Sequence, residues 1–316
     1  MPGAHVHRDL LTSVLHAAIQ APSPYNTQPW RFGPRRGGVD VLLDRDRVLA
    51  VADQDGREAR IACGAALFNL RTSLRTKEIG VHVRLTPSPS SGELLADVRF
   101  GARQKSCGEE HMLAAAIPNR HTNREPFLPR PLPGRTRHAL VRAAGCEGTG
   151  LYLVDDPAGC RAVSELVEAA AEAQHGDPRY LAELARWTTD CPRASDGVPR
   201  DANPLWHKEV PDQREQLVGV LLTSGDTAAD QVRAGLALQR VLLTATAWGA
   251  TASFLSPVVE LAESRAALRS MLDIRGHPQA VVRLGYGYPR QITARRPIAD
   301  VLVVGVSKQA SQEVVS

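Results

Sequence analysis

The sequence is poor in aromatic residues and lacks a long apolar segment. Phe, Trp and Tyr make up 4% of its 316 residues, and no apolar run approaches the roughly 18 residues that a membrane-spanning helix needs. The first ten residues, MPGAHVHRDL, lack the charged and then apolar order of a secretory signal. These absences argue against a membrane protein or a secreted one, and we expect a cytoplasmic protein with no membrane partner.

Cysteine is also scarce. The five cysteines are far apart and never stand in a Cys-x-x-Cys spacing, so neither a disulfide framework nor a zinc site is indicated. They are Cys63, Cys107, Cys146, Cys160 and Cys191. We expect no metal ion, and we expect free thiols that are mostly buried.

Neither sign of charge is in large excess. Lys and Arg number 38 and Asp and Glu 34, for a formal net charge of +4, and the two signs are interleaved along the chain. Proteins that bind nucleic acid usually carry a basic arm or patch, so we expect no nucleic-acid partner. The hydrophobic share of 43% is that of a globular protein, long enough here for one large or two medium domains.

Hydrophobic periodicity predicts helices that alternate with strands. Helices are expected at residues 9–20, 55–77, 135–144, from 156 onward, 227–248 and 258–272, and strands at 39–44, 81–85, 151–154, 217–224, 253–255 and 279–287. Asp55 with Glu58, and Thr227 with Asp230, have the spacing of helix-opening capping boxes, and Asp156 precedes a proline as a helix cap. The pattern predicts an α+β fold with mixed central sheets wrapped by helices.

The stretch APSPYNTQPW at residues 21–30 allows two interpretations. It can be a helix terminator followed by a turn, with Trp30 filling the core. Alternatively, its uncharged donors and acceptors, held still by three prolines, suit the edge of a flat heterocycle.

Two arginine-containing stretches also allow two interpretations, a solvent-exposed surface or a phosphate-binding site. In NRHTNREPF at residues 119–127, Arg120, Thr122 and Arg124 stand at alternate positions. They can form a solvated face or a phosphate clamp, because a guanidinium offers paired donors to phosphate oxygens. In GYGYPRQITARRPIADV at residues 285–301, Arg295 and Arg296 can be surface residues or the second arm of the same clamp. The glycines there lack the context of a dinucleotide-binding fingerprint.

Together these stretches resemble the FMN-dependent nitroreductase superfamily. PSPYNTQPW resembles its Ser-x-x-Asn-x-Gln-Pro-Trp loop, RHTNREPF its Arg-x-Ser/Thr-x-Arg/Lys element, and the 285–301 stretch its C-terminal strand and Arg-Arg-Pro turn. Here the arginine element follows the loop instead of preceding it. That order resembles the Acg-like branch of actinobacteria, in which one chain is similar to a fused pair of nitroreductase units.

The resemblance implies an FMN site and a role for each motif residue. The flavin ring would be lined by Pro22, Ser23, Pro24 and Asn26, with Gln28 in the same motif. Arg120 and Thr122 would hold the phosphate and ribityl end, supported by Arg295 and Arg296, and Arg124 would lie by the pyrimidine side. Backbone contacts to the ring edge would come from Ser256 and Pro257. No residue is assigned a catalytic role.

The resemblance also implies two units, with the first at 1–115 carrying the loop and the second at 116–316 carrying the clamp. The first unit has no clamp and the second has no second loop, so we expect one FMN per chain. Because the usual dimer interface becomes internal, either a monomer or a homodimer is expected. Residues 190–211 are rich in Pro, Asp and Gly. Loops of that length tend to be functional covers or disordered inserts, and we expect a lid there.

The resemblance is compatible with three functions. An open flavin would accept hydride from NADPH or NADH and pass it to a small acceptor such as a nitroaromatic or a quinone, since the cofactor carries the chemistry. A lidded flavin would instead make a flavin-sequestering protein of stressed or dormant cells. The third is a specialised biosynthetic flavin dehydrogenase, which shares the same motifs.

Overall fold

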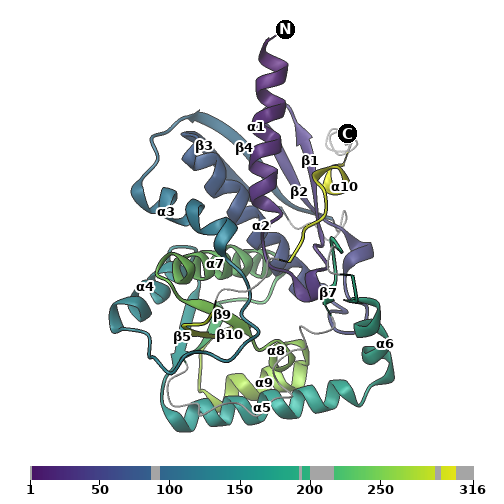
Figure 1. Cartoon of the computed structure of the whole chain (residues 1–316), viewed down its shortest axis with the longest axis vertical. Coiled ribbons are helices and arrows are strands. Elements are labelled where there is room, and N and C mark those ends of the chain that lie inside the picture. The colour runs from purple at the N-terminus through teal and green to yellow at the C-terminus, as the bar shows by residue number, and fades with distance from the viewer. Residues whose placement is uncertain (1, 87–92, 192–193, 200–216, 289–292, 304–316) are drawn as a thin grey trace, which may run out of the picture.

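The computed structural model describes residues 2–86, 93–191, 194–199, 217–288 and 293–303. The chain forms two four-stranded antiparallel sheets with helices packed against them and between them (Figure 1). The first sheet and the N-terminal helix lie in the upper part of this view, and the second sheet lies in the lower part.

The first sheet has the strand order β1-β2-β4-β3. Its strands are β1 (Trp30–Arg35), β2 (Gly38–Leu43), β3 (Ile79–Leu85) and β4 (Leu94–Arg103). Helix α1 (Pro2–Ala18) precedes the sheet, and helix α2 (Arg57–Thr76) connects β2 to β3. Trp30 is fully buried at the start of β1, as expected of a residue that fills the core.

The second sheet repeats this order of elements. Its strands are β5 (Gly150–Val154), β8 (Leu217–Thr223), β9 (Thr251–Phe254) and β10 (His277–Gly285), arranged as β5-β8-β10-β9. Helix α4 (Gly134–Gly145) precedes it, and helix α7 (Ala228–Ala247) connects β8 to β9. Numbered along the chain, the four strands of each sheet lie side by side in the same order: first, second, fourth, third. This agreement accords with the expectation of two similar units, whereas the boundary at residue 115 stays a prediction.

Helices α2 and α7 form the centre of the molecule. They pack on each other more extensively than any other pair of elements. Almost every residue of α2 from Arg57 to Leu74 is buried, because it meets the first sheet on one side and α7 on the other. Within this contact Gln239 donates a hydrogen bond from Nε2 to Oδ1 of Asn69 over 2.8 Å, so a buried polar pair fixes the register of the two helices.

Shorter elements surround this centre. They are α3 (Gly108–Ala116), α5 (Pro157–His175), α6 (Pro178–Arg186), α8 (Pro257–Glu260), α9 (Ala262–Met271), α10 (Ile298–Val301), the short strands β6 (Thr188–Thr189) and β7 (Val198–Pro199), and 3-10 turns at Pro24–Asn26, Arg45–Arg47 and Ile117–Asn119. Helices α5, α8 and α9 cover the lower face of the second sheet (Figure 1).

Two segments add parallel bridges at the edges of the sheets. Leu302, near the C-terminus, returns to the first half and pairs with Phe32 of β1, and Thr122 pairs with Ala252 of β9 within the second half. Figure 1 shows the yellow C-terminal segment with α10 returning to the purple N-terminal half. All pairs within the two large sheets are antiparallel, so parallel pairing enters them only at these bridges in the described part of the chain.

Several predicted helix boundaries are confirmed. The Asp156 side chain accepts a hydrogen bond from the amide of Gly159, and Thr227 and Asp230 form the expected capping box of α7. The box expected at Asp55 is wrong. Asp53 instead accepts the amides of Glu58 and Ala59 at 2.9 and 2.8 Å, because Gly56 adopts a left-handed conformation that turns the chain.

Other expectations need correction. The helix expected at 258–272 is two helices, α8 and α9, because Leu261 adopts an extended conformation between them. Of the cysteines, Cys63 and Cys160 are buried, but Cys107, Cys146 and Cys191 are exposed. None of the five cysteines, all of them in the described residues, forms a disulfide bond, as predicted. They are not mostly buried, because three of them lie at the ends of helices or in turns where the chain is open to solvent.

Among the described residues, none of the helices combines the length and the apolar character that crossing a membrane requires. The same residues contain no cluster of three or more His, Cys, Asp and Glu side chains arranged for a metal ion. Most of the segment expected to form a lid, residues 190–211, lies outside the described residues. Residues 190–191 and 194–199 of it are described, and Val198–Pro199 pairs in parallel with Thr188–Thr189.

Candidate functional site

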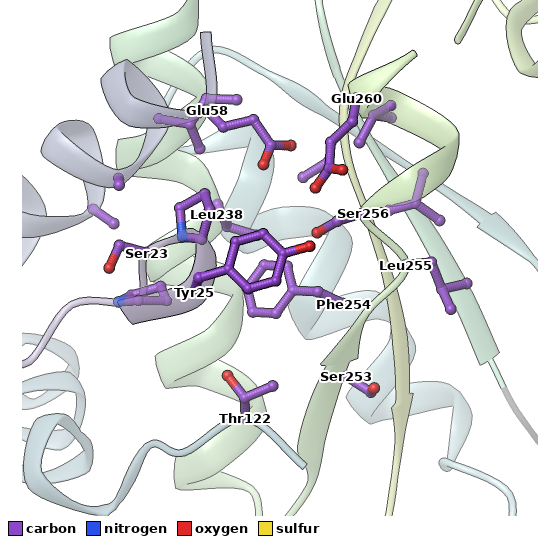
Figure 2. A pocket seen from close by; sticks show the side chains of 18 of the residues that line it. Ser23, Tyr25, Glu58, Thr122, Leu238, Ser253, Phe254, Leu255, Ser256 and Glu260 are labelled. Carbon is purple, nitrogen blue, oxygen red and sulfur yellow. The ribbon is translucent and has the colours of Figure 1, made fainter. Parts of the chain in front are cut away.

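A cavity of about 200 Å³ lies where α2, α7 and the second sheet meet. Its walls come from segments far apart in the sequence: residues 22–26, the first turns of α2, residues 120–124, α5, residues 253–260, β10 and residues 293–295. Figure 2 shows Tyr25 in the middle of this space, with Leu238 of α7 and Phe254 of β9 beside it. Most residues that the motifs single out therefore share one cavity.

The loop from Pro22 to Gln28 has an unusual backbone. Tyr25, Asn26 and Gln28 all have positive φ angles, of 46°, 56° and 53°, a region that side-chain-bearing residues rarely occupy. Such conformations cost of order 1 kcal/mol or more each and persist only where neighbouring groups fix them. Here the Gln28 amide donates to Oγ of Ser23 over 2.9 Å, which closes the loop on itself.

Gln28 and Arg296 lie behind the cavity wall and connect three segments. The Gln28 side chain is fully buried. Its Nε2 donates to the Ser195 carbonyl over 2.7 Å, and its Oε1 accepts the Arg296 amide over 2.9 Å. The Arg296 guanidinium donates to the Asp300 carbonyl over 2.8 Å and lies 3.5 Å from the Asp44 carboxylate. Both side chains therefore serve protein partners in this structure.

The arginine element reaches the cavity through its pairing with β9. The Asn123 amide donates to the Ala252 carbonyl over 2.7 Å, which extends the parallel bridge at Thr122. Residues on either side of this bond, Arg120 and Arg124, consequently line the same cavity as Thr122. From the C-terminal segment Arg295 joins them, held by its hydrogen bond to the Ala21 carbonyl over 3.2 Å.

This end of the cavity is strongly cationic. Arg120 is only 4% exposed, and burial together with the charges of Arg295 and Arg124 lowers its pKa to about 9. Burial and the charge of Arg124 lower the pKa of Arg295 to about 10. The Nε atoms of Arg120 and Arg295 are buried, and neither finds a hydrogen-bond partner within the described part of the chain. Such a cluster has unused donors and a positive field, which favours an anion.

The remaining predicted residues lie near the apolar part of the cavity. Ser256 lines it, while Pro257 is buried at the start of α8. Two tyrosines that no sequence motif singled out as site residues also meet here. The hydroxyls of Tyr25 and Tyr180 are 2.5 Å apart, which joins the loop to α6, and burial raises the pKa of each.

The opposite end of the cavity is acidic, and sequence analysis missed this as well. Glu58 of α2 and Glu260 of α8 point toward one another above the Tyr25 ring, whereas Thr122 and Ser253 lie on the other side of it (Figure 2). Burial raises the pKa of Glu58 to about 7, against the opposing effect of Arg57. Burial and the charge of Glu58 raise the pKa of Glu260 well above its usual range. The cavity thus has a cationic end and a carboxyl end.

Comparison with known proteins identifies relatives along the whole chain. No protein-family model matches it. It is 31% identical over 325 residues to "Uncharacterized protein Rv3127" of Mycobacterium tuberculosis, which covers 93% of each chain. It is 30% identical over 329 residues to "Putative NAD(P)H nitroreductase acg" of the same organism, which covers 96% of this chain and 98% of the relative.

Solved structures give weaker similarities. The FMN-dependent nitroreductase NfnB of Mycobacterium smegmatis in complex with NADPH is 16% identical, with a TM-score of 0.43 over 62% of this chain and 98% of that one. A nitroreductase of Bacteroides fragilis with bound FMN is 13% identical, with a TM-score of 0.38 over 65% of this chain and 97% of that one.

The nearly full-length similarity to the acg protein identifies the family. The chain belongs to the nitroreductase superfamily, in its Acg-like branch. This confirms the resemblance that the loop and arginine motifs carry in the sequence, and with it the α+β fold of sheets wrapped by helices.

Proposed function

We propose that the cavity binds FMN and that the protein is a flavin-dependent NAD(P)H oxidoreductase. The phosphate would bind Arg120, Arg295 and the Thr122 hydroxyl, with Arg124 beside the pyrimidine edge of the ring. The isoalloxazine would lie along residues 22–26 and 253–256. The acg relative is named as an NAD(P)H nitroreductase, which supports a nicotinamide as the electron donor.

The cationic end of the cavity is the observation that carries the proposal. Three arginines from two distant segments line one wall, and two of them hold buried Nε donors with no partner in the described residues. Burying like charges together is costly unless a counter-ion compensates for them. A phosphate group supplies both the negative charge and the hydrogen-bond acceptors, so these residues fit the acidic end of FMN.

The proposed roles differ among the motif residues. Pro22, Ser23, Pro24 and Asn26 line the cavity and would border the ring. Gln28 and Arg296 would act through the protein, because their side chains hold the loop, residue 195 and the C-terminal segment together. Ser256 would offer its backbone to the ring edge, and Pro257 would fix the start of α8 behind it.

The reaction follows from what such a cofactor does. Bound FMN supplies hydride transfer between a nicotinamide and an acceptor, and the protein supplies binding, orientation and electrostatics. Arg120 and Arg295 would hold the phosphate, and Arg124 beside the ring would stabilise the negative charge of the reduced flavin. A nitroaromatic or a quinone is the class of small acceptor proposed, with NADPH or NADH as the donor.

One observation favours a second function, the sequestration of flavin. Val198 lines the cavity, and the Ser195 carbonyl is held by Gln28, so part of the predicted lid segment lies against the site. A cover closed over the flavin would exclude the nicotinamide and leave a store instead of a reductase.

Anaerobic mixing with NADPH or NADH separates the two functions. The flavin-loaded protein should lose its yellow absorbance within seconds as the nicotinamide is oxidised. Dithionite provides the control, because it reduces flavin without a nicotinamide site. A flavin that dithionite bleaches and neither nicotinamide does would favour sequestration over the proposed reductase.

A further inference from the structure

The carboxyl end of the cavity has no part in holding the proposed cofactor. Glu58 and Glu260 come from different helices and direct their carboxyl groups into the same space (Figure 2). The proposed cofactor site accounts for the arginines and the loop at the other end. It does not account for two acids, Glu58 buried and Glu260 half-buried, that meet in one wall.

The partners of the two acids differ. Glu58 accepts a hydrogen bond from Nη2 of Arg57 over 3.0 Å. The same guanidinium also donates to the carbonyls of Gln279 and Val259, over 2.6 and 2.9 Å, so it is fixed on the Glu58 side. Glu260 accepts from the neutral side-chain amide of Gln174.

A count of charges shows what this arrangement favours. With both acids ionised, two negative charges would share one hydrogen-bonded cation in a buried wall. Two carboxylates in one site cannot both ionise easily, and one proton stays with the pair. Because Arg57 stabilises the charge on Glu58, the proton resides on Glu260. The buried Oε1 of Gln174, which has no partner in the described part of the chain, gives that proton a neighbouring acceptor.

Other ionisable groups lie around the pair. The charges of Asp53, Arg57 and Glu58 of α2 act on Glu260, and the charge of Glu260 acts on Tyr25 of the loop and Tyr180 of α6. Arg265 of α9 acts on Glu58, His175 of α5 contacts Tyr180, and Glu168 of α5 lines the cavity. Glu168 lines the cavity yet is exposed, which places it at the rim.

We propose that Glu260 is a catalytic acid that gives a proton to the acceptor during its reduction. The proposal rests on the function proposed above. Reduced flavin bound in the cavity would supply the hydride, with its two electrons, that one oxygen of a quinone takes up, and the flavin would be oxidised. The O–H bond of Glu260 breaks and a new O–H bond forms on the other quinone oxygen, which yields the hydroquinone. The Glu260 carboxylate then regains a proton from water at the rim.

The proton on Glu260 can be observed without any flavin. Infrared spectra of the ligand-free protein at pH 8, above the pKa of about 7 of Glu58, should show the carbonyl stretch of a protonated carboxyl, shifted in D₂O. The band should vanish in Glu260→Gln, because Glu58 beside Arg57 is ionised at that pH, and it should remain in Glu260→Asp and in Glu165→Gln, which changes an exposed acid of α5 outside the cavity. Loss of the band in Glu165→Gln, or its retention in Glu260→Gln, would overturn the assignment.

The transfer is tested with protein loaded with FMN, reduced by dithionite and mixed with p-benzoquinone in a stopped-flow instrument. Wild-type reoxidation should slow as the pH rises through the pKa of the pair. General acid catalysis contributes roughly 10²-fold or more, so Glu260→Gln should be slower by about that factor at low pH and independent of pH.

Glu260→Asp should restore the pH dependence, and Glu165→Gln, at an exposed position of α5 outside the cavity, should match the wild type. Equal rates and pH profiles in wild type and Glu260→Gln would refute the proposed acid. A wild type that fails to bind FMN would contradict the cofactor proposal instead, and the infrared measurement would still decide the position of the proton.

Discussion

Gly64 of α2 and Gly235 of α7 exclude each other's side chains. A Cβ atom on Gly64 would lie 2.1 Å from the Val232 carbonyl oxygen, and one on Gly235 would lie 2.0 Å from the Ile61 carbonyl oxygen. Gly64 thus faces the carbonyl of Val232, three residues before Gly235, and Gly235 faces the carbonyl of Ile61, three residues before Gly64. The backbones of the two central helices approach this closely only because both positions lack a side chain.

This relationship predicts that Gly64→Ala and Gly235→Ala destabilise the protein. The added methyl groups meet backbone atoms, which cannot rotate away, so the loss should be about 1–3 kcal/mol or more for each. Urea unfolding followed by circular dichroism measures it. Gly134→Ala is the control, because nothing lies within 4 Å of a Cβ there, and it should be neutral or slightly stabilising. Equal stability of all three variants would contradict the close helix contact.

Gln28 offers a test of the loop that borders the cavity. Gln28→Ala removes the acceptor of the Arg296 amide and the donor to the Ser195 carbonyl. Leaving such buried groups unpaired costs about 1–3 kcal/mol each, and the strained loop loses its anchor. We expect a lower free energy of unfolding together with weaker FMN binding, measured by fluorescence titration. The exposed Gln104 supplies the control Gln104→Ala, and a Gln28→Ala protein that matches it in both measurements would refute this role.

The raised pKa of Glu58 predicts how stability changes with pH. Its folded-state pKa of about 7 lies above the usual value of 4.5, so its contribution is fully present below about pH 4.5 and is lost as the pH rises through about 7. The contribution of Glu58 to the free energy of unfolding is at most roughly 3 kcal/mol.

Thermal unfolding measured at several pH values between pH 5 and pH 8 gives the change of the free energy of unfolding with pH. The wild type should lose stability across the range, and Glu58→Gln should lose less. Glu168→Gln, which changes an exposed acid, should keep the wild-type slope. A Glu58→Gln protein with an unchanged slope would show that Glu58 does not titrate in this interval.

Sequence patterns predicted the loop and arginine ends of the cavity because both consist of compact motifs. Residues 22–26, Arg120, Arg124 and Arg295 are separated by up to most of the chain, yet they line one cavity. The position of Arg296 was harder to foresee. Two adjacent arginines look alike in sequence, and only the folded chain turns one to the cavity and the other to Asp44 and Asp300.

The acidic end and several elements could not be read from the sequence. Glu58 and Glu260 are single acids in helical patterns, and such residues usually face solvent, whereas their burial depends on packing between distant helices. Strand β1 contains a glycine, a proline and two arginines, so its composition does not predict a strand. Its pairing with β2 over six residue pairs stabilises it nonetheless, because tertiary context outweighs local propensity.

The central claim is that the arginines of one chain bind the phosphate of one FMN, and a comparison of FMN with riboflavin tests it most directly. Calorimetric titration of the wild type should give one FMN per chain, bound more tightly than riboflavin. Arg295→Ala should remove much of that difference, because a charged hydrogen bond contributes about 1.5–3 kcal/mol, while the exposed Arg99→Ala should preserve it. Equal affinity of the wild type for FMN and riboflavin, or two FMN per chain, would contradict the account.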